Sequence, residues 1–296
     1  MNWIKKTGVV LSVVVVSGVL IHATSSGNLN ENKGTTMNYF PKSVDFAGEK
    51  APLEISDVKE RFDRELLVNA NWHSNTILTL KRANRAFPVI EPILKRYGVP
   101  DDFKYLAVIE SGLVNVVSSA GAKGVWQFMP DTAKEKGMEV NDEVDERYHL
   151  EKSTEAACKY LLAAKNKFGS WTLAAASYNG GMGGVNKQID IQKVDNYYDL
   201  LLTEETSRYV FRILAVKEIM KNPTVYGYNL TPDELYENLP VKKVEVDSTV
   251  TDWASFAKDQ GINYKILKIH NPWLRDKKLT NPLKKKYILD IPLKGY

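Results

Sequence analysis

The 296-residue sequence contains one cysteine and four histidines, and this scarcity excludes several kinds of site. A single thiol cannot build a disulfide framework or a zinc or iron–sulfur site with several cysteine ligands. Cys158 lies in an apolar helical run and is predicted to be a small core residue. The histidines have no metal-ligand spacing, and no H-E-x-x-H motif is present. We therefore expect neither a metal ion nor a cofactor.

The sequence also has no strong excess of charge of either sign. The net charge is +4, and residues 241–296 carry 12 Lys and Arg against 6 Asp and Glu, so the rest of the chain is close to neutral. Nucleic-acid-binding domains usually carry a pronounced basic patch, and no nucleic acid partner is expected. Hydrophobic residues at 44% and charged residues at 26% are typical of a globular protein, which we expect to be a monomer.

The N-terminal segment has an apolar run that is short for a membrane span. It extends from Gly8 to Ile21, whereas about 20 apolar residues are needed to cross a bilayer. The run follows Lys5 and Lys6, which is typical of a secretory signal. Residues 1–25 are predicted to be a signal peptide, or a membrane anchor if they stay uncleaved. The rest of the chain is then expected in the periplasm or cell envelope, with membrane contact through this segment alone.

Helical periodicity dominates the chain after a predicted flexible tether at 26–50, which is rich in Gly, Asn, Ser and Thr. Ser56 is expected to cap the first helix, and Pro88 and Pro100 fit the first turn of two later helices. Other helices are predicted over 153–168, 171–178 and 204–221. The sequence thus predicts a mainly α protein with its helical domain at 51–227.

The end of the chain has a different pattern. Strands and helices alternate there, and they are predicted at 241–246, 251–260, 264–270 and 287–291. After a linker at 228–240, residues 241–296 are predicted to form a β-α-α-β unit. A unit of this size buries little core of its own, so we interpret it as a small appended module.

One carboxylate is predicted to face the interior of the helical domain. Helical spacing places Glu110 on one face with the apolar side chains at positions 103, 106 and 107. Burial and the negative end of the helix dipole both disfavour a charged carboxylate, so the pKa of Glu110 is expected to be raised. Such a group can act as a general acid near neutral pH. The alternative is a solvated glutamate on a slightly rotated helix.

A later segment has the character of a ligand site. The loop from Ser118 to Gly124 consists largely of small residues, which let the backbone approach a ligand closely. It leads to Gln127, which lies between Trp126 and Phe128. Amides can bind the hydroxyl and acetamido groups of sugars, and aromatic rings their apolar faces. Taken alone, both rings fit a core helix equally well.

Together these residues resemble the catalytic domain of lytic murein transglycosylases, especially the membrane-bound D type. The matching segments are Glu110-Ser111, the loop at 118–124, VWQFMP at 125–130, SYNGG at 177–181 and ETSRYV at 205–210. They occur in the family's order and spacing across about 100–225. Val125 and Ser177 replace the residues usual in the family, which is a conservative departure. The resemblance implies a goose-lysozyme-like helical fold that acts on the glycan strands of peptidoglycan.

The resemblance also implies a role for each matching residue. Glu110 would be the single general acid and base. It would protonate the oxygen between N-acetylmuramic acid and N-acetylglucosamine, and then take a proton from the muramyl C6 hydroxyl, which attacks C1 and gives a 1,6-anhydro sugar. Tyr209 would orient Glu110. The other matched residues would bind the sugar or line its path: Ser111, Ser118, Trp126, Gln127, Phe128, Tyr178 and Asn179.

The C-terminal module resembles a diverged LysM domain, a peptidoglycan-binding fold. The resemblance rests on Val244-x-Val246, DSTV at 247–250 in place of the usual Gly-Asp-Thr-Leu, Asn271-Pro272 and YILDIP at 287–292. Its lysines could favour anionic polymers of the envelope, or they could simply form a solvated face.

Three other functions fit parts of the sequence. A hydrolytic muramidase on the same fold would release a reducing sugar, which differs from the anhydro product by one water. A penicillin-binding serine enzyme would use Ser56-x-x-Lys59 and Ser177-x-Asn179, but no suitable Lys-Thr-Gly follows. A non-catalytic protein that binds peptidoglycan has no need of an acid on an apolar helix face.

Overall fold

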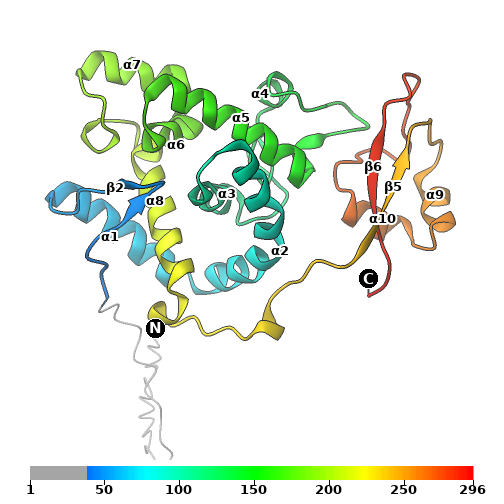
Figure 1. The fold of residues 1–296 in the computed structure, drawn as a ribbon, viewed down its shortest axis with the longest axis horizontal. Helices are drawn as coiled ribbons and strands as arrows, with labels where there is room; N and C mark the ends of the chain where they lie inside the picture. Colours follow the sequence, from blue (N-terminus) through cyan, green and yellow to red (C-terminus); the bar gives the residue numbers. More distant parts are fainter. Residues whose placement is uncertain (1–38, 296) are drawn as a thin grey trace, which may run out of the picture. The chain divides into compact units, whose positions relative to one another are not determined.

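A computed structural model describes residues 39–295 of the chain (Figure 1). The predicted signal peptide or anchor at 1–25, and the predicted tether as far as residue 38, lie outside the described residues. Within 39–295, no helix is both long enough and apolar enough to cross a lipid bilayer.

The first part of the structure is helical, as the sequence predicts, and its strands are only two residues long (Figure 1). The helices are α1 (Ser56–Asn71), α2 (His73–Tyr97), α3 (Lys104–Ser111), α4 (Pro130–Glu135), α5 (Leu150–Phe168), α6 (Trp171–Gly180), α7 (Met182–Gln192) and α8 (Glu204–Lys221). Two antiparallel hairpins are formed by β1 (Asp45–Phe46) with β2 (Glu49–Lys50), and by β3 (Val116–Val117) with β4 (Lys123–Gly124). Short 3-10 helices are η1 (Asp101–Phe103), η2 (Glu146–Tyr148), η3 (Tyr197–Asp199), η4 (Pro223–Tyr226) and η5 (Pro232–Glu234).

Two expectations about helix starts are wrong. α2 begins at His73 and continues through Pro88, which does not open a helix. The inner face of α2, including Ile90 and Leu94, is fully buried. Burial of that face outweighs the hydrogen bond that a proline removes from a helix interior. Ser56 is the first helical residue of α1 and makes no cap; its hydroxyl instead donates to the carboxylate of Glu60 at 3.0 Å.

The segment 39–50 is part of the core, although its composition suggests the end of a tether. Phe46 in the β1–β2 hairpin is fully buried, and its ring lies 4.9 Å from that of Phe103. The N–H of Ala47 donates to the carboxylate of Asp102 at 2.7 Å. The apolar surface of Phe46 supplies the free energy that orders this segment.

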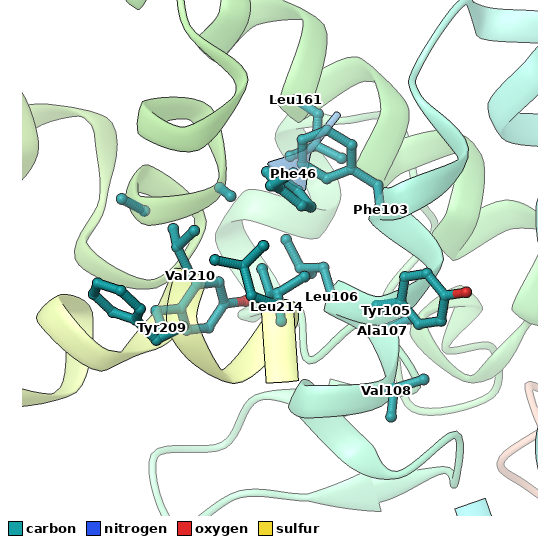
Figure 2. Packing of buried hydrophobic residues seen from close by; sticks show 14 of the residues in the cluster. Phe46, Phe103, Tyr105, Leu106, Ala107, Val108, Leu161, Tyr209, Val210 and Leu214 are labelled. Atoms are coloured by element: carbon teal, nitrogen blue, oxygen red, sulfur yellow. The ribbon is translucent and has the colours of Figure 1, made fainter. Parts of the chain in front are cut away.

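The helix α3 is short and is packed against α2 and α8. Leu106 and Ala107 are fully buried. Figure 2 shows Leu214 and Tyr209 of α8 close to the α3 residues, within the same cluster of apolar side chains. This packing holds the end of α3, where Glu110 lies.

The C-terminal part has the predicted β-α-α-β order, shown in orange and red in Figure 1. Its elements are β5 (Val241–Val246), α9 (Trp253–Asp259), α10 (Tyr264–His270) and β6 (Tyr287–Pro292). β5 and β6 pair antiparallel, with Val246 opposite Tyr287. Trp253, Leu267 and Leu289 are fully buried and form the centre of its apolar cluster.

This C-terminal unit is joined to the helical part by backbone hydrogen bonds at residues 139–149. The N–H of Asp145 donates to the carbonyl of Trp273 at 2.9 Å, and the N–H of Arg275 donates to the carbonyl of Glu143 at 2.8 Å. These bonds are directional and need both segments in one geometry. The C-terminal unit is therefore docked on the helical part at a defined position.

Aromatic packing strengthens the same junction. The ring of Trp273 stacks between those of His149 and Tyr287, with centroids 5.7 Å away on each side. Val144 and Tyr148, from the helical part, belong to the same buried cluster as the C-terminal core. Burial lowers the pKa of His149 to about 4, so the imidazole in this stack is neutral near pH 7.

The linker predicted at 228–240 lies along α2. The N–H of Tyr236 donates to the carbonyl of Lys81 at 3.2 Å, and the guanidinium of Arg85 lies 5.5 Å from the centre of the Tyr236 ring. Asn238 donates to the carbonyl of Arg85 at 2.8 Å. Residues 236–238 of the linker are thus held by contacts to α2.

Replacement of Trp273 with alanine tests whether the two parts share a core. Trp273 is 4% exposed, and we expect Trp273→Ala to lower the free energy of unfolding by about 3–5 kcal/mol. Urea denaturation of the full chain measures this change. The matched control is Leu283→Ala, at a side chain that is 90% exposed, for which a change below about 0.5 kcal/mol is expected. Equal, small effects of both substitutions would contradict a shared core.

Candidate active site

Glu110 lies at the point where α3 stops. Gly112 has a φ of 61°, and its N–H donates to the carbonyl of Val108 at 2.8 Å, which closes the helix after Ser111. The apolar residues of the same face are buried, whereas Glu110 is only partly buried. The carboxyl group therefore lies between the apolar core and a cavity that Glu110 and Ser111 help to line.

Tyr209 of α8 donates a hydrogen bond from its phenol to Oε1 of Glu110. The Tyr209 side chain is 1% exposed, and burial and the negative charge of Glu110 raise its pKa well above the usual 10. The phenol therefore stays protonated and remains a donor. Oε2 of Glu110 makes no hydrogen bond within residues 39–295, so it is the oxygen available to a ligand.

Burial raises the pKa of Glu110 to about 7, because a poorly solvated carboxylate is disfavoured. The hydrogen bond from Tyr209 and the positive charge of Arg212 act in the opposite direction, and the negative charge of Glu205 adds to the rise. Near neutral pH, Glu110 is thus populated in both its protonated and its ionised form. A single group that first gives and later takes a proton needs both forms.

Three α8 residues around Glu110 lie on one face of the helix. Glu205, Tyr209 and Arg212 are spaced at i, i+4 and i+7. The guanidinium of Arg212 donates to the carbonyl of Ile109 at 3.0 Å, which places it beside the end of α3. The carboxylate of Glu205 accepts a hydrogen bond from the amide of Asn179 at 3.0 Å. One helix thus brings an acid, a phenol and a cation to the same carboxyl group.

Hydrogen bonds within the chain hold the loop that carries Ser118 and Gln127. The hydroxyl oxygen of Ser118 accepts from the N–H of Ala122 at 3.0 Å. The amide nitrogen of Gln127 donates to the carbonyls of Gly124 and Val116 at 2.6 and 3.1 Å. The Ser118 O–H and the Gln127 Oε1 have no partner within residues 39–295, so they are the polar groups of this loop that a ligand could use.

Gly124 allows this loop to approach the segment that supports the C-terminal unit. Its φ is 86°, and a Cβ at this position would lie 1.9 Å from the carbonyl oxygen of Arg147. Any other residue would therefore clash with backbone. Arg147 is itself buried and pairs with Asp145 at 2.7 Å. The predicted ligand loop and the docking segment are packed directly against each other.

Trp126 and Phe128 are core residues in this structure, and their predicted contact with the sugar stays a prediction. They are 0% and 3% exposed. The indole of Trp126 donates to the hydroxyl of Thr154 at 2.8 Å, and Phe128 packs edge-on against Tyr178 with centroids 5.9 Å apart. Gln127 between them has a φ of 50°, and its side chain is less buried than either ring. The buried area of the two rings explains why they turn inward.

Tyr178 and Ser111 tie the loop to the helices. The phenol of Tyr178 donates to the carbonyl of Trp126 at 2.8 Å, and the hydroxyl of Ser111 donates to the carbonyl of Val125 at 2.8 Å. Burial and the charge of Glu110 raise the pKa of Tyr178 well above 10. Both hydroxyl hydrogens are therefore used within the chain, which supports a positioning role for these side chains.

A cavity of about 280 Å³ beside Glu110 is a feature that the sequence reasoning missed. Its walls come from the α1–α2 junction, including Trp72 and Thr79, and from the second half of α8, including Arg212 and Val216. No motif marks the α1–α2 junction. The one available signal was the helical spacing of Arg212, which puts it on the face of α8 that carries Tyr209. Ser118, Gln127, Tyr178 and Asn179 do not line this cavity.

The thiol and the acidic groups of residues 39–295 offer no metal-binding arrangement. No group of three or more His, Cys, Asp or Glu side chains in this part of the chain is placed to hold a metal ion. Cys158 is fully buried, as predicted, and burial raises the pKa of its thiol to about 12.

Replacement of Tyr209 with phenylalanine tests the control of the Glu110 pKa. The hydrogen bond from Tyr209 stabilises the ionised carboxylate, so its loss in Tyr209→Phe should raise the pKa of Glu110 above about 7. Titration of the carboxyl carbon by NMR measures the shift. Tyr160→Phe is the control, because its hydroxyl donates to a backbone carbonyl on α6 and not to Glu110. A fall in the Glu110 pKa in Tyr209→Phe would contradict this account.

Two parts of the chain match known domain families. Residues 88–200 match the family described as the transglycosylase SLT domain, and residues 242–295 match the soluble lytic transglycosylase C-terminal LysM-like domain. The chain is also 29% identical over 235 residues to the membrane-bound lytic murein transglycosylase D of Escherichia coli strain K12 and of Escherichia coli O6:H1. The match covers 76% of this chain and 50% of each relative, so the chain spans half the length of these curated relatives. The helical part that carries Glu110 is thus similar to a transglycosylase SLT domain, and the docked C-terminal unit is similar to a LysM-like domain.

Proposed function

We propose that this chain is a lytic transglycosylase that cleaves the β-1,4 bond between N-acetylmuramic acid and N-acetylglucosamine in peptidoglycan. Glu110 acts as the single general acid and base, and the product is a strand with a 1,6-anhydromuramyl end. The observation that carries the proposal is the partly buried Glu110 within an SLT domain, with a pKa near 7 and one oxygen held by Tyr209.

The first step needs a protonated carboxyl group that reaches the glycosidic oxygen. The raised pKa keeps a large fraction of Glu110 protonated near neutral pH. Tyr209 occupies Oε1 and so directs the acidic proton to Oε2. Transfer of this proton breaks the bond between C1 and the leaving oxygen, and Glu110 becomes a carboxylate. The charge of Arg212 then stabilises the ionised form.

The second step uses the same group as a base. The ionised Glu110 takes the proton of the muramyl C6 hydroxyl, and the C6 oxygen forms a bond to C1 of the same sugar. Because the nucleophile belongs to the substrate, the reaction needs no second carboxylate, unlike glycoside hydrolysis. Glu110 ends the cycle protonated, ready for the next bond.

A hydrolytic muramidase is the alternative that one observation favours. Glu205 is a second carboxylate, close enough to Glu110 for its charge to raise the Glu110 pKa, and Asn179 holds it. In a hydrolase it could activate a water molecule. Mass spectrometry of the digestion products separates the two reactions, because the anhydro product is lighter by one water.

The proposed location and partners follow from the substrate. We propose that the chain acts in the cell envelope, where peptidoglycan lies, and that both its domains contact glycan strands as a monomer. The curated relatives are described as membrane-bound, which supports an envelope location here. The apolar run at 8–21 would provide export and, if uncleaved, attachment.

Replacement of Glu110 with glutamine tests the catalytic role. Glu110→Gln keeps the shape but cannot exchange a proton, so release of anhydromuropeptides from purified peptidoglycan should fall by about 10⁴-fold or more. Glu135→Gln, at an exposed glutamate of α4, should leave the rate unchanged. A folded Glu110→Gln variant that releases anhydro products at close to the original rate would exclude the mechanism.

The same substitution has an effect on stability that depends on pH. The pKa of Glu110 is raised from 4.5 to about 7 in the folded state, so between these values the folded chain binds a proton that the unfolded chain has lost. The free energy of unfolding of the original protein therefore falls as pH rises from about 4.5 to 7. Glu110→Gln does not share this loss. Its stability relative to the original protein should grow across this range by at most about 3 kcal/mol, and denaturant titrations at several pH values measure it.

Fusion of residues 1–50 to a reporter that is active only after export tests the location. We expect an active reporter, because a basic start followed by a short apolar run directs secretion. The matched control lacks residues 8–21 and should give an inactive reporter. An inactive reporter with the full segment would rule out the envelope location through this segment.

A further inference from the structure

The cavity beside Glu110 has an unusual combination of walls. One side is polar and uncharged, with Asn75 and Thr79 of α2, and another is apolar, with Val216 and Met220 of α8. Its volume of about 280 Å³ is just below the range of roughly 300–1,000 Å³ typical of small-molecule sites. It therefore suits one substituent of a polymer rather than the polymer chain.

A buried hydroxyl in this cavity has no partner. Thr79 is 4% exposed, and its Oγ1 makes no hydrogen bond within residues 39–295. Buried polar atoms are nearly always hydrogen-bonded, because leaving one unpaired costs about 1–3 kcal/mol. The amide of Asn75, on the same wall one helical turn earlier, is also without a hydrogen bond in the described chain. Both groups are therefore available to a ligand that carries amide or hydroxyl groups.

A cation in the same cavity forms no ion pair within residues 39–295, and Glu110 is the carboxyl group on which its charge acts. Arg212 donates one N–H to the carbonyl of Ile109, and no carboxylate of residues 39–295 lies within 4.0 Å of its guanidinium. A guanidinium has five N–H donors in a planar fork that matches a carboxylate. Most of these donors are free for a ligand that brings a negative charge.

We propose that this cavity binds the peptide stem carried by the muramyl residue of the substrate strand, with Arg212 pairing with a stem carboxylate and Asn75 and Thr79 bonding to its amides. The inference rests on the proposed function and names a further part of the substrate. Where the lactyl carboxyl group of the muramyl residue is in amide linkage to the stem, the sugars of the strand carry no charge, so they cannot form an ion pair with Arg212. A peptide stem supplies carboxylates for Arg212, amides for α2 and methyl groups for the apolar wall.

The position of the cavity is consistent with this assignment. Glu110 lines it, and the muramyl C1–oxygen bond must lie beside Glu110 during cleavage. The loop residues Ser118 and Gln127, which keep free polar groups for a sugar, do not line it. The strand and its peptide can thus contact different surfaces around one carboxyl group.

Three synthetic oligosaccharides of the same length test the proposal. The first carries a muramyl peptide with free carboxylates, the second the same peptide with its carboxylates converted to carboxamides, and the third a simple lactyl amide without peptide. For the original chain we expect kcat/KM to fall about tenfold from the first to the second, since a charge-assisted hydrogen bond is lost. A further fall of a few-fold is expected from the second to the third, since neutral hydrogen bonds are lost.

Two substitutions should affect these two ratios separately. Arg212→Gln should bring the ratio of the first to the second substrate close to one and keep the ratio of the second to the third. Thr79→Val, which keeps the shape, should do the reverse. Each ratio compares substrates on the same variant, so a change in the Glu110 pKa cancels. Ser74→Ala, at an exposed residue of α2 that does not line the cavity, should change neither ratio. Arg212→Lys keeps the positive charge and should restore part of the ratio of the first to the second substrate.

The outcomes separate this inference from the proposed function. If the original chain cleaves all three substrates with equal kcat/KM, the cavity does not bind the peptide, although the proposed function stands. If Arg212→Gln slows the three substrates by the same factor, Arg212 serves the sugar or Glu110 and the inference is excluded. If the original chain cleaves none of them, the proposed function fails, and this inference fails with it.

Discussion

The hydrogen bond from Tyr209 to Glu110 is the interaction on which the rest of the site depends. It joins the end of α3 to the middle of α8, and so it links the two helices that carry all the charged groups of the site. Burial of the carboxyl group opposes the effect of this hydrogen bond on the Glu110 pKa. If desolvation were weaker, the phenol and Arg212 would leave Glu110 ionised and unable to donate a proton. The pKa of Glu110, about 7, is therefore a balance between an apolar environment and two neighbours that stabilise the ionised form.

The surrounding structure keeps these two helices in place through packing. Leu106 of α3 and Leu214 of α8 lie in one apolar cluster, and residues 39–50 close its other side through Phe46 (Figure 2). The loop that carries Ser118 and Gln127 is tied to the same framework by Ser111 and Tyr178, whose hydroxyls donate to the backbone carbonyls of Val125 and Trp126. Several side chains that the sequence motifs suggest as ligand contacts, such as Ser111 and Tyr178, make their hydrogen bonds within the chain. They hold in place the loop whose Ser118 O–H and Gln127 Oε1 have no partner within residues 39–295.

Much of this arrangement could be predicted from the sequence, and the limits have physical causes. The helix face on which Glu110 lies, and with it the raised pKa, follow from the helical spacing of apolar residues. The β-α-α-β module follows from the strand and helix patterns of residues 241–296. The sequence could not decide whether Trp126 and Phe128 line a cleft or fill the core, because the motif reads the same in both cases. The prediction that Pro88 opens a helix was wrong, because the burial of Ile90 and Leu94 outweighs the preference of proline for the first turn of a helix. The α1–α2 wall of the cavity depends on contacts between distant segments, and no local pattern encodes them.

The docking of the C-terminal unit on residues 139–149 has a consequence for how strongly a polymer would be held. Two binding modules on a flexible linker gain from each other through an effective concentration that the linker sets. Here the hydrogen bonds at Asp145 and Arg275 and the stacked Trp273 remove that freedom. A strand that contacted both domains would pay no entropy to bring them together, but it would have to follow the one path between them that the docking allows. The docked arrangement would therefore accept fewer strand paths than a flexible one, but it would place the strand in a fixed register at Glu110.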